Sequence, residues 1–421
     1  TGQSKPKYIF LSPTATVNKN TKMTRPEPSQ SYKASQFEKV LKSNIVNEID
    51  LRKLSWNGIP DQHRARTWKI LLGYLPTNSS RSGILRRKRE EYRHFASLYA
   101  QQHPSVRTDH ERQLIKQVRA DVQRTAPYIP LFRANRVQVS LERLLYTWSV
   151  RHPASSYVQG INDLATPLFT VFLQDYFDGL DVTELQYLDA ISDDILLEVE
   201  ADCYWCLNSL LSKIQDHYTP DQPGIQRMLF QMENLLRRVD PDLHTYLKGL
   251  GVELIHFAFR WMNCLLVREM SMKCTIRMWD TYLSESNGFD DYHVYVCAAF
   301  LHHFGHKLKK MEFEEALAAL TQGIGRLPYG EFDVLDLEVV LSQAYVWRSR
   351  FKGSPAQLDS LDWEQEGDMV LKTKNYQMVS SSHVCSPQSR GTTQQIGVGV
   401  KSLVEALFPI SLMSDVGSLF S

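Results

Sequence analysis

The chain has 421 residues and 43% hydrophobic side chains, which is enough to bury one large core or two smaller ones. Its 48 Lys and Arg residues nearly balance 47 Asp and Glu residues, and the formal net charge of +1 gives no sign of a nucleic-acid or membrane-surface partner. Any partner is therefore recognised through local patches of the surface.

The six cysteines are scattered along the chain without the spacing of a disulfide framework, which favours a reducing, cytoplasmic compartment. Cys203 and Cys206 form a Cys-x-x-Cys pattern, but a zinc site would need a second pair or nearby histidines. The pair lies inside a helical pattern of apolar residues. We therefore expect core thiols and no metal site.

Residues 1–35 are rich in Thr, Ser, Asn, Lys and Pro, too polar to offset the entropy of ordering, so we expect a flexible arm. They also lack the basic-then-apolar order of a secretory leader. Apolar residues at helical spacing begin at residue 36, and we expect a folded domain over residues 36–351. The Ser/Gln-rich residues 352–421 are expected to form a disordered tail, with a short amphipathic stretch at 403–408 as a candidate partner-binding element.

A Gly-Ile-Pro sequence at residues 58–60 precedes a helix that we expect to run from Pro60 to Leu72. Arg64 and Trp68 lie four residues apart and share one face of this helix. Because an arginine beside a tryptophan on a helix face is ordinarily stacked or paired, a structural role for Arg64 is favoured over a catalytic one.

A second helix is expected over residues 84–99, and four consecutive basic residues, 86–89, lie at its start. Such a run is most often a solvated helix face. Nuclear targeting and attraction to an acidic partner are the alternatives.

The first polar cluster of interest ends a helix expected over Glu111 to Arg124, because Pro127 disfavours a helical conformation at Ala126. Asp121 and Arg124 lie three residues apart on one face, so the carboxylate can orient the guanidinium. On its own, Arg124 is better explained as a cation that offsets the helix dipole.

The second cluster is a loop, Tyr157 to Asp163, which follows a helix expected over residues 137–150. Gly160 can adopt a backbone angle that other residues avoid, and Gln159 is expected to project from the bend. A plain alternative for Gln159 is a loop residue bonded to backbone. Next along the chain, Asn162, Asp163 or Thr166, the last with Pro167 behind it, are candidate caps of the following helix.

The remaining sequence predicts further helices and almost no alternating strand pattern, so the fold class is all-α. A Pro- and Gly-rich break near residues 218–224 is the expected boundary between two subdomains. Polar residues within Leu250 to Val267 favour a buried core helix there over a membrane span. The helices expected after the glutamine loop cover residues 168–176, 184–190, 195–217, 225–239, 241–250, 251–267, 271–282, 293–308, 313–321 and 334–351.

Three ordered motifs in this chain resemble those of the TBC-domain family of Rab GTPase-activating proteins. They are Gly-Ile-Pro-x-x-x-Arg-x-x-x-Trp at residues 58–68, Val-x-x-Asp-x-x-Arg-Thr at 118–125 and Tyr-x-Gln-Gly at 157–160. Val118 stands where the family usually has isoleucine. The long form of the third motif is similar to the branch of TBC domain family member 22. A Met-Trp-Asp sequence at 278–280 resembles a packing signature of the family's second half, which implies that Trp279 lies in the core.

The resemblance implies a two-subdomain helical TBC domain that activates GTP hydrolysis by a GTP-bound Rab protein. It implies that Arg124 is an arginine finger and that Gln159 replaces the partner's water-positioning glutamine. Asp121 would orient Arg124, while Tyr157 and Gly160 shape the glutamine loop and Arg64 supports the site. The partner would bind GTP and Mg²⁺, because this chain contains no G-x-x-x-x-G-K-[ST] phosphate loop and would not be an enzyme alone.

Two other interpretations stay open from the sequence. One is a helical interaction scaffold that binds a Rab or an adaptor without accelerating hydrolysis, and the weaker one is a lipid-binding module acting through the C-terminal apolar segment. The family's substrates suggest peripheral association with Golgi or endosomal membranes and a role in vesicle trafficking, although the chain itself shows no lipid anchor.

Overall fold

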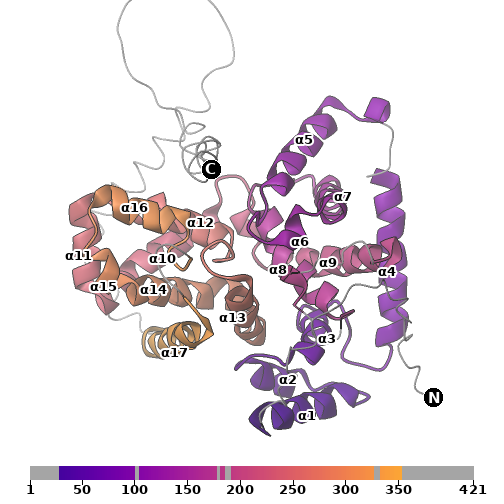
Figure 1. Ribbon diagram of the computed structural model, residues 1–421, viewed down its shortest axis with the longest axis horizontal. Helices are drawn as coiled ribbons and strands as arrows, with labels where there is room; N and C mark the ends of the chain where they lie inside the picture. The colour runs from indigo at the N-terminus through magenta and orange to yellow at the C-terminus, as the bar shows by residue number, and fades with distance from the viewer. Residues whose placement is uncertain (1–27, 100–103, 178–180, 185–190, 327–331, 353–421) are drawn as a thin grey trace, which may run out of the picture.

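The computed structural model describes residues 28–99, 104–177, 181–184, 191–326 and 332–352, and these residues form helices and connecting segments without a β-strand (Figure 1). The predicted all-α class is confirmed. The first group of helices comprises α1 (Pro28–Lys42), α2 (Glu48–Ser55), α3 (Asp61–Leu71), α4 (Arg81–Tyr99), α5 (Asp109–Gln123), α6 (Pro130–Arg133), α7 (Asn135–Arg151), α8 (Ile161–Gln174) and α9 (Asp193–Lys213). The second group comprises α10 (Pro223–Val239), α11 (Pro241–Leu250), α12 (Ala258–Asn263), α13 (Met272–Ser284), α14 (His293–His303), α15 (Gly305–Leu308), α16 (Phe313–Gln322) and α17 (Val334–Phe351).

Helix α8 is the centre of the first group, and every residue from Ile161 to Leu173 is buried. A helix that is buried on all sides is surrounded by other elements, and α8 contacts α7, α9, α13, α3 and α5. Pro167 lies inside this helix and cannot donate a backbone hydrogen bond to the carbonyl of Asp163. The Thr166 hydroxyl donates to that carbonyl instead, at 2.8 Å, so the helix tolerates the proline.

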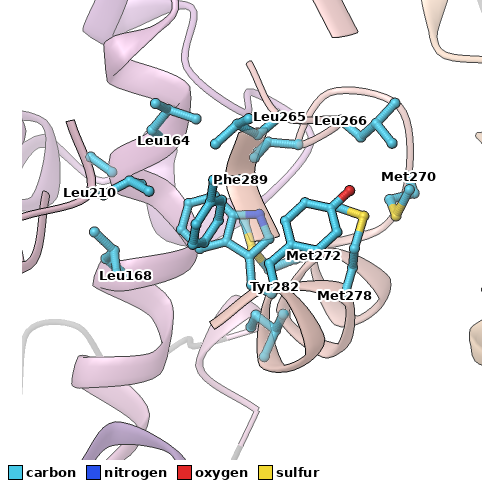
Figure 2. Packing of buried hydrophobic residues seen from close by; sticks show 14 of the residues in the cluster. Leu164, Leu168, Leu210, Leu265, Leu266, Met270, Met272, Met278, Tyr282 and Phe289 are labelled. Atoms are coloured by element: carbon cyan, nitrogen blue, oxygen red, sulfur yellow. The ribbon is translucent and has the colours of Figure 1, made fainter. Parts of the chain in front are cut away.

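The two groups share a hydrophobic core (Figure 2). Leu164 and Leu168 of α8 and Leu210 of α9 lie at one side of the cluster, next to Phe289 and Leu265 of the second group. The cluster continues through Tyr282, Met278 and Leu266. The chain passes from one group to the other through a turn at 218–222 (Figure 1). The division into two subdomains near residues 218–224 stays a prediction.

Three predicted element boundaries need correction. Helix α1 begins at Pro28, before the expected domain start at residue 36, with a proline in the first turn where its missing N–H costs nothing. The helix expected over 293–308 is divided into α14 and α15. The first helix expected after the glutamine loop begins at Ile161 rather than at residue 168.

The core helix expected over residues 251–267 is broken. It consists of a short 3₁₀ turn, Leu254–His256, the six-residue helix α12 and a tight turn in which Leu265 and Leu266 have positive φ angles of 49° and 58°. Both leucine side chains are fully buried, and their burial holds a backbone conformation that these residues rarely adopt. No described helix is long and apolar enough to cross a membrane.

The basic run at residues 86–89 is only partly a solvated face. Arg86 and Arg87 are exposed, but Arg89 forms ion pairs with Asp202 and Glu198 of α9. Asp202 also pairs with Lys69 of α3, so this buried carboxylate joins three helices. Burial opposes ionisation of Asp202, but Lys69 and Arg89 outweigh it and lower its pKa. A sequence run cannot show which of its charges finds a buried partner.

Part of the sequence-based prediction lies outside the described residues. This holds for residues 1–27 of the expected flexible arm, for residues 185–190, for almost all of the expected tail over 352–421 and for the amphipathic stretch at 403–408.

Candidate functional site

Helix α5 carries Arg124 at its C-terminal end. Thr108 caps the N-terminus, accepting from the Glu111 backbone N–H at 3.2 Å, and the Glu111 carboxylate accepts from the Thr108 N–H at 2.7 Å. This capping box starts the helix at Asp109, before the expected Glu111. Leu114, Val118 and Val122 bury the inner face, and this packing fixes where the last turn points.

Arg124 lies at the C-cap, and its guanidinium is held by a single carboxylate. The Nε and Nη2 atoms donate to Oδ1 of Asp121 at 3.1 and 2.6 Å, so the predicted pair is present. The Arg124 side chain is 41% exposed, whereas Asp121 is buried. Nη1 makes no hydrogen bond among the described residues, so this edge of the guanidinium remains available for a ligand.

The second oxygen of the same carboxylate reaches the glutamine loop. The Tyr157 hydroxyl donates to Oδ2 of Asp121 at 2.8 Å, which joins two segments 36 residues apart. Burial, with the Asp121 charge beside it, raises the pKa of Tyr157 well above its ordinary value, so the hydroxyl keeps its proton. Tyr157 therefore acts as a fixed donor between the arginine and the loop.

Asn162 closes the connection between the two segments. Its Oδ1 accepts from the Gly160 backbone N–H at 3.0 Å and lies 3.0 Å from the Tyr157 hydroxyl, while its Nδ2 donates to the Thr125 hydroxyl at 2.9 Å. The Thr125 hydroxyl in turn donates to the Asp121 carbonyl at 2.8 Å. All of these polar groups are buried and paired, so they hold the arginine and the loop as one unit.

The expected caps of α8 are wrong. Gly160 is the N-cap residue and no side chain caps the helix, because Asn162, Asp163 and Thr166 all lie inside it. Gly160 has φ 108°, which confirms that this position requires a glycine conformation. A Cβ atom at Gly160 would collide with Nδ2 of Asn263, so the loop also leaves no space for a side chain.

Asn263, at the end of α12 in the second group, fixes the glutamine loop from the opposite side. Its Nδ2 donates to the backbone carbonyl of Gln159 at 2.8 Å. Behind it, Cys264 lies 3.7 Å from the buried carboxylate of Asp163. Burial raises the pKa of both groups, Asp163 and Cys264. The loop is thus held between α8 and α12, on residues from both groups.

Gln159 does not project freely from the bend, contrary to the expectation from the sequence. Its side chain is half-buried, and Nε2 is covered by protein without a hydrogen-bond acceptor among the described residues. A buried donor without an acceptor costs about 1–3 kcal/mol, because it has lost its hydrogen bonds to water. The amide nitrogen therefore reaches an external partner only if the side chain changes its conformation, and pairing there would recover this cost.

Arg64 lies away from these contacts. It pairs with Asp61 and with the buried Asp280 of α13, and donates to the carbonyl of Ile59. Asp280 also accepts from the Trp68 indole at 2.7 Å and from the Ile59 backbone N–H at 2.8 Å. Burial raises the pKa of Asp280, and the positive charge of Arg64 opposes this effect. Arg64 therefore fastens α3 to α13, and its hydrogen bonds do not reach the glutamine loop.

Sequence reasoning missed Asn162 as a junction, and it predicted neither the contact of Thr125, which belongs to the second motif, nor that of Asn263. Asn162 was visible only as a candidate helix cap, and Asn263 as a polar residue in an apolar run. Short-range sequence patterns cannot show the contact of Asn162 with Thr125, 37 residues away, or that of Asn263 with Gln159, 104 residues away. Among the described residues, no group of three or more His, Cys, Asp or Glu side chains is placed to hold a metal ion, and Cys203 and Cys206 are both buried in α9.

The all-α fold and the paired arginine and glutamine segments define a class of protein. Residues 61–309 match the family model of the Rab-GTPase-TBC domain, and the chain belongs to this family. Over 331 residues it is 42% identical to TBC1 domain family member 22B of Homo sapiens, an alignment that covers 77% of this chain and 63% of that protein.

Fungal relatives are equally similar. The chain is 43% identical over 332 residues to GTPase-activating protein gyp1 of Schizosaccharomyces pombe, which covers 77% of this chain and 62% of that protein. The crystal structure of the Ypt/Rab-GAP domain of Gyp1p superposes with a TM-score of 0.70 at 43% identity, covering 77% of this chain and 99% of that domain. The resemblance to the family, and to its member 22 branch, is confirmed. The chain spans less than two thirds of the length of these two curated relatives.

Proposed function

We propose that this chain is a GTPase-activating protein for GTP-bound Rab proteins and that Arg124 is its arginine finger. Negative charge develops on the γ-phosphate and on the bridging oxygen during GTP hydrolysis, and a GTPase without a cation there is slow. An arginine inserted by a partner accelerates hydrolysis by about 10³ to 10⁵, or roughly 4 to 7 kcal/mol of barrier.

Gln159 supplies the second group. Its carbonyl oxygen accepts a hydrogen bond from the attacking water, and its amide nitrogen donates to the phosphate. This role requires the side chain to turn outwards on docking. Because the covered Nε2 has no hydrogen-bond acceptor among the described residues, pairing it with the phosphate favours this turn.

One observation carries the proposal above the others: an exposed guanidinium is oriented by groups that are themselves buried. Asp121, Tyr157, Thr125 and Asn162 all lie in the interior, yet the group they position is directed to solvent. A structural ion pair needs no such support at the surface, where isolated pairs contribute little stability. A guanidinium that must meet an external ligand in a fixed position does need this support.

The partner supplies GTP and Mg²⁺, so this protein acts as an activator and not as an enzyme with a nucleotide of its own. The name of the S. pombe relative, a GTPase-activating protein, supports the same activity here. We further propose that the protein works in vesicle trafficking, on the cytoplasmic side of Golgi or endosomal membranes, and that its terminal segments bind adaptors or regulators.

Single-turnover GTP hydrolysis by a panel of Rab proteins tests the proposal. At least one Rab should be accelerated, and Arg124→Ala should remove most of the acceleration while the far-UV spectrum stays that of the folded protein. The melting temperature should fall modestly, because the buried Asp121 carboxylate loses its cation. Arg119→Ala is the matched control, because Arg119 is exposed on the same helix but pairs with Glu142 at 3.1 Å. An interaction scaffold would bind a Rab yet show no acceleration for Arg124→Ala to remove.

A further inference from the structure

We infer that Tyr128, Arg268 and Arg326 form a docking surface for the GTPase, beside the two catalytic groups. We call these three residues the Tyr128 surface. The inference rests on the proposed function and adds the residues that hold the partner in place. None of the three belongs to the motifs that carry the resemblance.

Tyr128 is an exposed aromatic residue on a rigid segment. It lies four residues after Arg124 in the chain, and the residue is 51% exposed. The turn before it is fixed: Ala126 is buried with φ 41°, and the Ile129 N–H donates to the Ala126 carbonyl at 2.9 Å. A large aromatic side chain kept in water on an ordered turn is the kind of group that contributes strongly to an interface.

Arg326 holds the ring from the second group of helices. Its guanidinium carbon lies 4.0 Å from the centroid of the Tyr128 ring, within the range of a cation–π contact. Nε donates to the Met270 carbonyl at 3.0 Å, and Nη2 donates to the carbonyls of Val267 and Met270 at 2.9 and 2.8 Å. Because these bonds fix Arg326, the ring is ordered before any partner arrives, which lowers the entropic cost of binding.

Arg268 extends the same surface towards the glutamine loop. Its side chain is 40% exposed, and Nη1 lies 3.9 Å from Oδ2 of Asp163, three residues after Gly160. Asp163 is buried, so the accessible charge at this place is that of the arginine. The surface therefore joins the segment that follows Arg124 to the segment that follows Gln159.

The chemistry of the surface indicates what it binds. An aromatic ring with one guanidinium against it and the charge of a second arginine nearby fits a surface that offers an apolar side chain beside carboxylates. The occupant is the GTP-bound Rab that receives Arg124, since a protein engaged with that finger must cover the adjacent surface. Attraction between exposed charges weakens as salt is added, so the affinity due to Arg268 should fall with ionic strength.

Single-turnover hydrolysis over a range of protein concentrations tests the inference with the Rab that responds best. Tyr128→Ala should raise the half-saturating concentration about tenfold, as expected for an interface hot spot, with the maximal rate within twofold of the unchanged protein. Tyr128→Phe should keep most of the affinity. Arg268→Ala should raise the half-saturating concentration at low salt and reduce its salt dependence.

Tyr32→Ala is the control, because Tyr32 is 68% exposed on α1 and far along the chain from the site. It should change neither parameter. An unchanged half-saturating concentration in Tyr128→Ala, or a loss of maximal rate as large as that of Arg124→Ala, would overturn the docking role. If the docking role is overturned but Arg124→Ala still abolishes acceleration, the proposed function stands without the docking surface. If the unchanged protein accelerates no Rab, the proposed function and the docking surface are both wrong.

Discussion

The hydroxyl of Tyr157 donates to one oxygen of the Asp121 carboxylate, at 2.8 Å, while the other oxygen accepts from Arg124. One buried carboxylate thereby joins the tyrosine of the glutamine loop to the arginine at the end of α5. A shift of either segment must move the other, because Asn162 ties the loop back to Thr125 as well. The geometry of the two groups is therefore set jointly, and several consequences are measurable.

Tyr157→Phe removes this hydroxyl and keeps the ring. We expect the maximal rate of stimulated hydrolysis to fall about tenfold, because a small misplacement of a catalytic group costs large factors in rate. Oδ2 of Asp121 loses its donor, so stability should fall by about 1–3 kcal/mol. Tyr74→Phe is the matched control: Tyr74 donates to the buried Asp202 at 2.7 Å, so this variant should lose similar stability in urea unfolding but keep its rate.

Gly160→Ala tests the backbone of the glutamine loop. The added Cβ would collide with the Asn263 amide in a conformation with φ 108°, so both the strain and the collision destabilise the loop. We expect a loss of about 2–4 kcal/mol and of nearly all acceleration. Gly83→Ala provides the comparison, because Gly83 lies within α4 and a Cβ atom there would have no neighbour within 4 Å, so this variant should be neutral or stabilise by about 0.5–1 kcal/mol. Equal melting temperatures for the two variants would contradict this account.

Asn263→Asp replaces the amide that donates to the backbone carbonyl of Gln159 with a carboxylate of the same shape, which can only accept. The maximal rate should fall about tenfold if Asn263 acts by positioning the glutamine. In a Gln159→Ala background the same change should cause almost no further loss, because the side chain that it positions is gone. Additive losses in this double-mutant cycle would assign Asn263 a general structural role instead.

The stability of the protein should depend on pH through the protonation of His293. This residue is fully buried, where its Nδ1 lies 2.7 Å from the Tyr282 hydroxyl and its Nε2 lies 3.1 Å from the Trp261 carbonyl. Burial lowers the pKa of His293 from 6.5 to about 3, so the unfolded chain takes up the proton first as pH falls. Stability is then complete above about pH 6.5 and is lost towards pH 3, by roughly 2 kcal/mol at pH 5. Urea unfolding at pH 7.5 and pH 5 should show this loss, and His293→Gln should reduce the difference.

Much of the site was visible in the sequence because its parts are local. The pairing of Asp121 with Arg124 follows from helical spacing, and the need for glycine at residue 160 follows from its place in a tight bend. The all-α class follows from apolar periodicity in the same way.

The rest depends on contacts between distant parts of the chain. Periodicity predicted a helix through Leu265 and Leu266, but their buried side chains hold the backbone in a turn there. The contact of Asn263 with the glutamine loop and that of Arg89 with Asp202 arise only when α12 and α9 are in place. The buried amide of Gln159 was likewise invisible, since a loop pattern gives no measure of what covers it.

The claim that Gln159 acts in place of the partner's glutamine is tested most directly with a Rab variant whose own water-positioning glutamine is changed to leucine. Single-turnover hydrolysis of GTP by that variant should still be accelerated strongly by this protein, and Gln159→Ala should abolish the acceleration. Two results would contradict the account. One is that Gln159→Ala still accelerates hydrolysis by the Rab variant, and the other is that the unchanged protein fails to accelerate it.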